Sequence, residues 1–159
     1  MLEITGTPRV LVVDDESIIA DTLVLILTKS GYEATAAYSG EQALDLAPVI
    51  EPHVLISDVA MKGINGIETA ICITSQLPEC RVVLFSGQAH AADLLQEART
   101  QGYNFEILRK PVEPSVLLDY IHSLLNASDA KTPEKGISKK STYVAIVDDH
   151  STRPAPARV

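Results

Sequence analysis

The sequence predicts an α/β protein in which five parallel strands form one doubly wound sheet with helices on both faces. Short apolar runs rich in β-branched residues alternate along the chain with amphipathic stretches of helical periodicity. Most of the amphipathic stretches stop at a glycine or a proline. Five strand–helix units in succession imply a parallel sheet, with right-handed crossovers that place helices on either side.

The first strand is expected at Arg9–Val13, because this Val-rich run is continuous, as in parallel strands that are buried on both faces. Four further apolar runs are expected to be strands. They are Glu33–Tyr38, Val54–Ser57, Arg81–Phe85 and Phe105–Leu108.

The first helix is expected at Ser17–Ser30, where large aliphatic side chains recur at helical spacing and Gly31 provides a stop. The second is expected to be short and to end where Pro48 interrupts its pattern. The remaining predicted helical ranges, the second included, are Gly40–Ala47, Ile64–Leu77, Ala89–Gln101 and Glu113–Asn126.

The composition indicates one folded domain with a tail. Hydrophobic residues make up 46% of the 159 residues, which is enough for a substantial core. We expect an N-terminal extension at 1–7, the folded domain at 8–126, a polar and flexible linker at 127–142 and a tail at 143–159. The two cysteines, Cys72 and Cys80, have no metal-site or redox spacing and are interpreted as packing residues.

The tail contains one segment that echoes the start of the domain. YVAIVDDHS at Tyr143–Ser151 resembles RVLVVDDES at Arg9–Ser17. It is either the first strand of a truncated second domain, or an edge strand that pairs with the sheet of its own chain or of a second copy in a homodimer, or a chance similarity. Nothing equivalent to the rest of the first domain follows Asp149, so no catalysis is assigned to it.

The charge distribution excludes some partners. The net charge is −8, and the predicted domain carries the excess of acidic residues, so direct nucleic-acid binding is not expected. No apolar run approaches the roughly 20 residues that a membrane helix needs. The N-terminus also lacks the features of a secretion signal, so we expect a cytoplasmic protein without a membrane partner.

Chemically active side chains follow the predicted strands at one edge of the sheet. Ligands in open α/β sheets bind beyond the carboxyl ends of the strands, near the switch in strand order. The polar residues at these ends are Asp14, Asp15 and Glu16 after the first strand, Asp58 after the third, Ser86 after the fourth, and Arg109 and Lys110 after the fifth. We therefore expect three aspartates, a hydroxyl and an amine to converge there.

This set of side chains suits Mg²⁺ and phosphoryl chemistry. Crowded carboxylates repel one another unless a cation compensates them, and a few carboxylate ligands suit Mg²⁺. Asp58 stands alone at its strand end and is the natural nucleophile, because carboxylates can form aspartyl-phosphates. Lys110 and Ser86 would offer an ammonium and a hydroxyl to the phosphoryl oxygens.

At these positions the chain closely resembles the receiver domains of two-component response regulators, the CheY-like superfamily. The resemblance extends over about residues 8–126. The matching pieces are VLVVDDE (Val10–Glu16), LISDVAM (Leu55–Met61), NG (Asn65–Gly66), LFSG (Leu84–Gly87) and LRKPVEP (Leu108–Pro114). It implies a flavodoxin-like strand order 2-1-3-4-5.

The resemblance also implies roles for the residues at the sheet edge. Asp58 would be the phosphoacceptor and a Mg²⁺ ligand. Asp15 would bind the ion directly, Asp14 largely through water, and the backbone carbonyl of Ala60 would complete the protein ligands. Ser86 and Lys110 would contact the phosphoryl group. The donor would be a sensor histidine kinase or a phosphotransfer protein, and phosphorylation would signal to a downstream protein through the face formed by residues 89–126.

Three residues depart from the family pattern. Lys62 stands where proline is usual, so the loop after Asp58 is either looser or carries an extra cation. The switch position that is often aromatic is Ile107, with Phe105 two residues earlier, so activation is expected to work instead through Ser86 and the loop that follows it. Ser86 itself replaces the commoner threonine and keeps the hydroxyl.

Two other functions remain open. Lys62 and Ile107 favour a pseudo-receiver, an interaction module that has lost regulated phosphorylation. A phosphohydrolase would need a second general acid two residues beyond the nucleophile, where this chain has Ala60. The expected protein is therefore a signalling receiver rather than an enzyme, acting only on its own phosphorylation and dephosphorylation.

Overall fold

A computed structural model describes residues 4–87 and 91–127. Its five strands form one sheet in the order β2-β1-β3-β4-β5, and every neighbouring pair is parallel. The strands are β1 (Arg9–Val13), β2 (Glu33–Ala37), β3 (Val54–Asp58), β4 (Arg81–Ser86) and β5 (Ile107–Arg109). The predicted fold class and strand order are confirmed.

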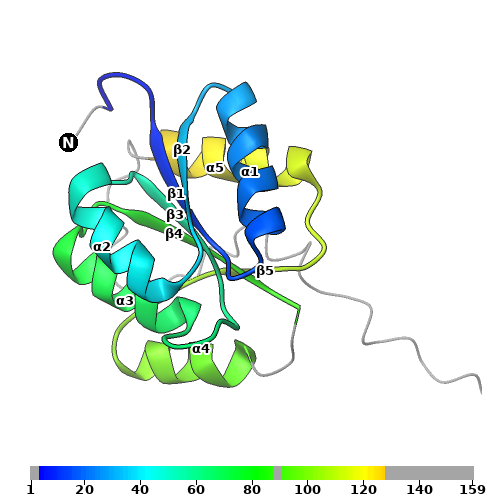
Figure 1. Cartoon of the computed structure of the whole chain (residues 1–159). Coiled ribbons are helices and arrows are strands. Elements are labelled where there is room, and N and C mark those ends of the chain that lie inside the picture. The colour runs from blue at the N-terminus through cyan, green and yellow to red at the C-terminus, as the bar shows by residue number, and fades with distance from the viewer. Residues whose placement is uncertain (1–3, 88–90, 128–159) are drawn as a thin grey trace, which may run out of the picture.

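Five helices cover the two faces of this sheet, as Figure 1 shows. Helices α1 and α5 lie on one face, and α2, α3 and α4 lie on the other. Their bounds are α1 (Ser17–Lys29), α2 (Gly40–Ile50), α3 (Gly66–Gln76), α4 (Ala91–Thr100) and α5 (Pro114–Asn126).

Alternation along the central strands divides the core into two layers. In β1, Val10 and Val12 face α1 and α5, while Leu11 and Val13 face α2, α3 and α4. All five residues of β3 are buried, which explains why the run is apolar from Val54 to Ile56 and has only Ser57 as a polar residue before Asp58.

Helix α2 is longer than predicted. The sequence predicts an end at Ala47 because proline lacks an N–H, yet the helix continues through Pro48 to Ile50. Pro48 lies in the last turn on the exposed side, where water can satisfy the carbonyl that loses its helical partner. Glu51 then ends the helix in the left-handed conformation, with φ of 49°.

The start of β5 is also later than predicted. The strand begins at Ile107, opposite Leu84 of β4, whereas the sequence predicts a start at Phe105. Phe105 is buried before the strand and stacks on Tyr103, with ring centroids 5.8 Å apart. Packing of this aromatic pair, rather than strand pairing, accounts for the apolar residue at 105.

Helix α3 begins at Gly66 rather than at the predicted Ile64, because Asn65 caps it. The Asn65 side chain accepts a hydrogen bond from the Glu68 N–H at 2.9 Å, and the Glu68 carboxylate accepts one from the Asn65 N–H at 3.0 Å. Four predictions fall wholly or partly on residues outside the described part of the chain: the extension 1–7 (described from residue 4), the start of the fourth helix at Ala89, the linker 127–142 (described only at Ala127) and the tail 143–159.

Candidate functional site

The first two acids of the site follow β1 directly. Asp14 is 2% exposed, and its backbone N–H donates to the carbonyl of Ala37 at 3.1 Å, which ties it to the end of β2. One oxygen of its carboxylate accepts from the Glu16 N–H at 2.9 Å. Asp15 is exposed, and its Oδ2 accepts from the Lys62 N–H at 3.4 Å. The structure thus separates a buried carboxylate from an exposed one in adjacent residues.

Asp58 is the last residue of β3 and is 8% exposed. Its strand pairs with β4, where it lies opposite Phe85. Behind it, Gly66 at the start of α3 approaches so closely that a Cβ there would overlap with the backbone oxygen of Asp58. That oxygen also accepts from the Ser57 hydroxyl at 3.0 Å. The main chain of Asp58 is therefore fixed from the α3 side.

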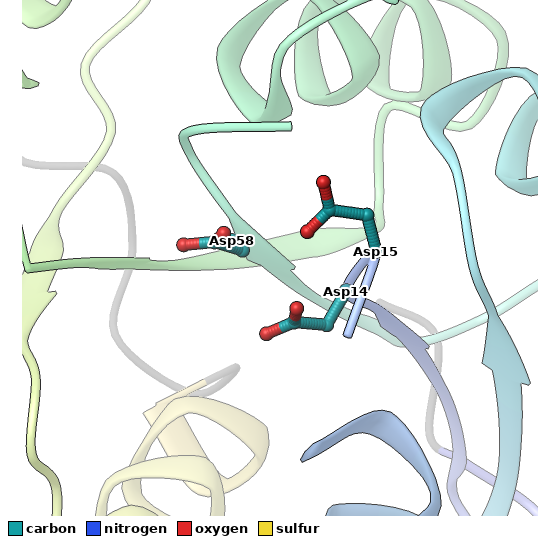
Figure 2. A group of neighbouring side chains, drawn as sticks. All are labelled: Asp14, Asp15 and Asp58. Atoms are coloured by element: carbon teal, nitrogen blue, oxygen red, sulfur yellow. The ribbon is translucent and has the colours of Figure 1, made fainter. Parts of the chain in front are cut away.

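The three aspartates form one cluster. Asp14 and Asp15 project from the end of β1 and Asp58 from the end of β3, as Figure 2 shows. One carboxylate oxygen from each lies within 4.8 Å of the others. Burial raises the pKa of Asp58 above its usual range, and the nearby charges of Asp14 and Asp15 add to this, although Lys110 opposes it. The cluster thus carries negative charge that the protein compensates only in part.

A small divalent cation fits this donor set. The cluster offers several hard oxygen ligands in a partly buried position that retains an opening to solvent, as Mg²⁺ prefers. A bound ion would also offset the burial, and the repulsion by Asp14 and Asp15, that together raise the pKa of Asp58. The acidic cluster is therefore a candidate Mg²⁺ site.

Lys110 links two of the three aspartates. Its Nζ lies 3.3 Å from Oδ2 of Asp14 and 3.3 Å from Oδ1 of Asp58. Burial by itself lowers the pKa of the Lys110 ammonium, but the two carboxylates outweigh burial and raise it. Lys110 therefore stays charged while it contacts the cluster.

Ser86 ends β4 at the same edge of the sheet. It is 5% exposed, and its carbonyl accepts from the Lys110 N–H at 2.9 Å, so the ends of β4 and β5 are joined. Ile107 lies partly buried in β5, opposite Leu84 and on the side of α4. Phe105 is buried in the same layer. The predicted metal-binding and phosphoryl-contacting residues thus lie at the carboxyl edge, whereas Ile107 begins β5 and Phe105 lies before that strand.

An open depression lies over this cluster. Its lining includes Ala60 and Lys62 from the loop after β3, together with Asp58, Lys110 and Asp15; Glu16 and Gly87 complete it. Asp58 is therefore reachable from solvent although it is mostly buried.

Glu41 also contributes to this region, and sequence reasoning missed it. Its carboxylate accepts from the Ile64 N–H at 3.1 Å, and this hydrogen bond holds the pKa of Glu41 below its usual range. Glu41 also lies against Gly63, whose φ is 76°. It orders the loop that follows Asp58, and no sequence signal could have identified it because the contact joins the start of α2 to a distant loop.

The doubly wound sheet with an acidic pocket at its carboxyl edge defines a receiver-type signalling domain. Residues 10–122 match the response regulator receiver domain, and the chain belongs to this family of two-component response regulators. It is a signalling domain rather than a conventional enzyme.

Individual relatives agree with this assignment. The chain is 27% identical over 117 residues to the chemotaxis protein CheY of Thermotoga maritima, covering 73% of this chain and 96% of that protein. It is 28% identical over 146 residues to the transcriptional regulatory protein AfsQ1 of Streptomyces coelicolor, covering 91% of this chain but only 60% of that regulator. The crystallised chemotaxis protein CheY4 of Vibrio cholerae matches with a TM-score of 0.66 and 28% identity, covering 75% of this chain and 99% of that one.

None of the helices in residues 4–87 and 91–127 is both long enough and apolar enough to span a bilayer.

Proposed function

We propose that this chain is an active phosphoacceptor receiver, in which Asp58 accepts a phosphoryl group in a Mg²⁺-dependent reaction. The observation that carries the proposal is the position of Asp58, which is held at the end of a buried strand, opens onto the depression and lies 3.3 Å from Lys110. A fixed nucleophile beside a fixed positive charge is what phosphoryl transfer requires, because this reaction depends mainly on positioning and charge stabilisation.

The residues around Asp58 have separate roles in this proposal. Asp58 and Asp15 would hold the cation, together with the backbone carbonyl of Ala60, while buried Asp14 would act largely through water. When bound, the cation supplies positive charge that screens the approach of an anionic donor to an anionic carboxylate. Lys110 is close enough to contact a phosphoryl group on Asp58.

Ser86 is the proposed second contact to the phosphoryl group. It ends the strand beside Asp58, and the backbone hydrogen bond from Lys110 to its carbonyl fixes the two phosphoryl-contacting residues relative to each other. Ile107 and Phe105 are proposed as neighbours of the switch rather than as the switch itself, since both pack in the α4 layer. Formation of the phospho-aspartate would then change the position of Ser86 and of the loop that follows it.

In the transfer itself, a carboxylate oxygen of Asp58 forms a bond to phosphorus as the bond between phosphorus and the donor atom breaks. The leaving group, an imidazole of a histidine kinase or phosphotransfer protein, departs with that electron pair and recovers a proton from solvent. Water later cleaves the acyl phosphate, which returns the carboxylate and releases inorganic phosphate. These steps concern only the chain's own phosphorylation.

The signal is proposed to pass to a protein partner in the cytoplasm. The described part of the proposed output face consists of α4, β5 and α5 (Figure 1). Acidic residues outnumber basic ones within residues 1–126, which disfavours direct DNA contact by this part of the chain. AfsQ1 is named as a transcriptional regulator, but this chain spans 60% of its length, so a DNA-binding output is not carried over.

Phosphoryl transfer from a small acyl phosphate tests the proposal directly. Wild type, Asp58→Asn and Asp45→Asn are incubated with radiolabelled acetyl phosphate, with Mg²⁺ and with EDTA. Asp45 is an exposed aspartate of α2 and serves as the matched control. We expect Mg²⁺-dependent labelling of wild type and Asp45→Asn, and none of Asp58→Asn. Labelling of Asp58→Asn would remove Asp58 from its role, and absence of labelling in wild type would favour the pseudo-receiver alternative suggested by Lys62 and Ile107.

A further inference from the structure

Lys62 lies in the loop between β3 and α3, on the rim of the depression over Asp58. Its backbone N–H donates to Oδ2 of Asp15 at 3.4 Å, so its main chain is attached to the acidic cluster. Lys62 is an exposed residue and is one of those that line the same depression as Asp58 and Lys110. The structure therefore places a second lysine at the entrance to the site.

The two lysines of the site differ in whether their ammonium groups are already paired with carboxylates. Lys110 pairs with Asp14 and Asp58, at 3.3 Å in each case. Within the described part of the chain, the Lys62 ammonium forms no ion pair. The charge of Lys110 is thus already shared between two carboxylates, whereas that of Lys62 is available to an anion arriving from solvent.

An anionic donor meets an unfavourable field at this entrance. Asp15, Glu16 and Asp58 line the depression, and Asp14 lies beneath them in the cluster. A phosphoryl donor carries one or two negative charges of its own, so each acidic side chain opposes its approach. A free ammonium on the rim offsets part of this repulsion before the donor reaches Asp58.

We propose that the Lys62 ammonium contacts the incoming phosphoryl donor and selects for donors of higher negative charge. This inference rests on the proposed function, because it takes Asp58 as the acceptor. With an acyl phosphate, an Asp58 oxygen bonds to phosphorus as the phosphorus–oxygen bond to the acyl group breaks, and the carboxylate leaves with the electron pair. Lys62 takes no part in this exchange of bonds and acts only on donor binding.

The size of the effect follows from the exposure of Lys62. A single exposed charge pair at contact distance changes a binding equilibrium by about 2-fold to 5-fold at low salt. The effect is screened as ionic strength rises, since the Debye length falls to about 3 Å at 1 M salt. It should also be larger for a dianionic donor than for a monoanionic one.

The test compares wild type, Lys62→Gln, Lys62→Arg and Lys62→Glu, with Lys29→Gln as a matched control. Lys29 ends α1, and the strand that follows α1 enters the sheet from the opposite edge to the site. Initial rates of labelling are measured against the concentration of acetyl phosphate, a dianion, and of phosphoramidate, a monoanion, at saturating Mg²⁺ and at two salt concentrations.

We expect Lys62→Gln to raise the half-saturating acetyl phosphate concentration about 2-fold to 5-fold at low salt, with an unchanged maximal rate. Lys62→Glu should raise it further, Lys62→Arg should restore it, and Lys29→Gln should match wild type. The difference should shrink with phosphoramidate and at high salt.

Equal half-saturating concentrations for wild type and Lys62→Gln would overturn the inference while leaving Asp58 as the acceptor. A loss of maximal rate that arginine does not restore would also overturn it, because that pattern reports a disturbed loop. If wild type is not labelled by either donor, the inference and the proposed function fail together, and Asp58→Asn then gives the same blank result as wild type.

Discussion

Removing the charge of Asp58 should stabilise the metal-free protein. Asp58 lies in a cluster where one oxygen of each aspartate is within 4.8 Å of the others, and it is also 3.3 Å from Lys110. Asp58→Asn therefore removes the repulsions from Asp14 and Asp15 and the attraction to Lys110, while it keeps the shape of the side chain. Burial of the charged group adds to the repulsive side, as the raised pKa of Asp58 indicates.

The magnitude can be worked from these distances. At an effective dielectric constant of about 20, two like charges at the outer limit of 4.8 Å repel by about 3.5 kcal/mol, and opposite charges 3.3 Å apart attract by about 5 kcal/mol. Two repulsions then exceed one attraction by about 2 kcal/mol, and in full solvent the excess falls to about 0.5 kcal/mol. We expect Asp58→Asn to raise the free energy of unfolding within this range, or the melting temperature by about 2 to 6 °C.

Urea unfolding at pH 7.5 in EDTA, followed by far-UV circular dichroism, measures this change. The control Asp45→Asn removes an exposed aspartate of α2 and should stay within about 0.5 kcal/mol of wild type. Adding Mg²⁺ should stabilise wild type more than Asp58→Asn, because binding to the folded state adds to its stability. An Asp58→Asn protein that is no more stable than wild type in EDTA would refute the electrostatic argument.

The raised pKa of Asp58 also determines how the stability of the metal-free protein changes with pH. The folded state holds the Asp58 proton more tightly than the unfolded state does, so folding takes up a proton between the two pKa values. In EDTA, this site makes wild type more stable as the pH falls through the raised pKa of Asp58, and Asp58→Asn lacks that component. The free energy of unfolding is compared between wild type and Asp58→Asn at each pH. If wild type becomes less stable relative to Asp58→Asn as the pH falls through that range, the predicted direction is contradicted.

Three further predictions concern the surroundings of the site. Gly66→Ala should cost about 1 to 3 kcal/mol of stability, because its methyl group would overlap with the backbone oxygen of Asp58; a neutral result in urea unfolding would contradict that close approach. Asn65→Ala should cost about 1 kcal/mol in the same assay, through loss of the capping box of α3, and unchanged stability would show that the cap contributes nothing. Burial raises the pKa of the Cys80 thiol to about 12, so a thiol reagent at pH 8 should label half-buried Cys72 first and Cys80 only in urea; equal labelling of both in the folded protein would refute this.

The order of the elements and the acidic edge could be predicted from local sequence alone. Apolar runs that end directly in Asp14 and Asp58 locate both the strands and the edge, because parallel strands share one carboxyl side. The pattern of apolar runs therefore indicates the edge without any information about packing. It places each residue at the edge, but it does not show which side chains touch.

Features that depend on contacts between distant segments could not be predicted in this way. The continuation of α2 past Pro48 depends on which side of the helix faces water, and the late start of β5 depends on where Phe105 packs. The support of the loop after Asp58 by Glu41 joins residues 23 positions apart. The strand-like segment at 143–151 lies outside the described residues and stays a prediction.

The close approach of Gly66 to the backbone of Asp58 makes the two flanks of that residue mechanically unequal. On the α3 side, Gly66 packs directly against the backbone of Asp58, so the main chain there cannot move closer to α3. Towards β4 and β5 the restraints are hydrogen bonds between strand ends, among them the bond from Lys110 to Ser86. If the main chain of Asp58 shifts when a group is added to its carboxylate, we therefore expect the shift on the β4–β5 side rather than against α3.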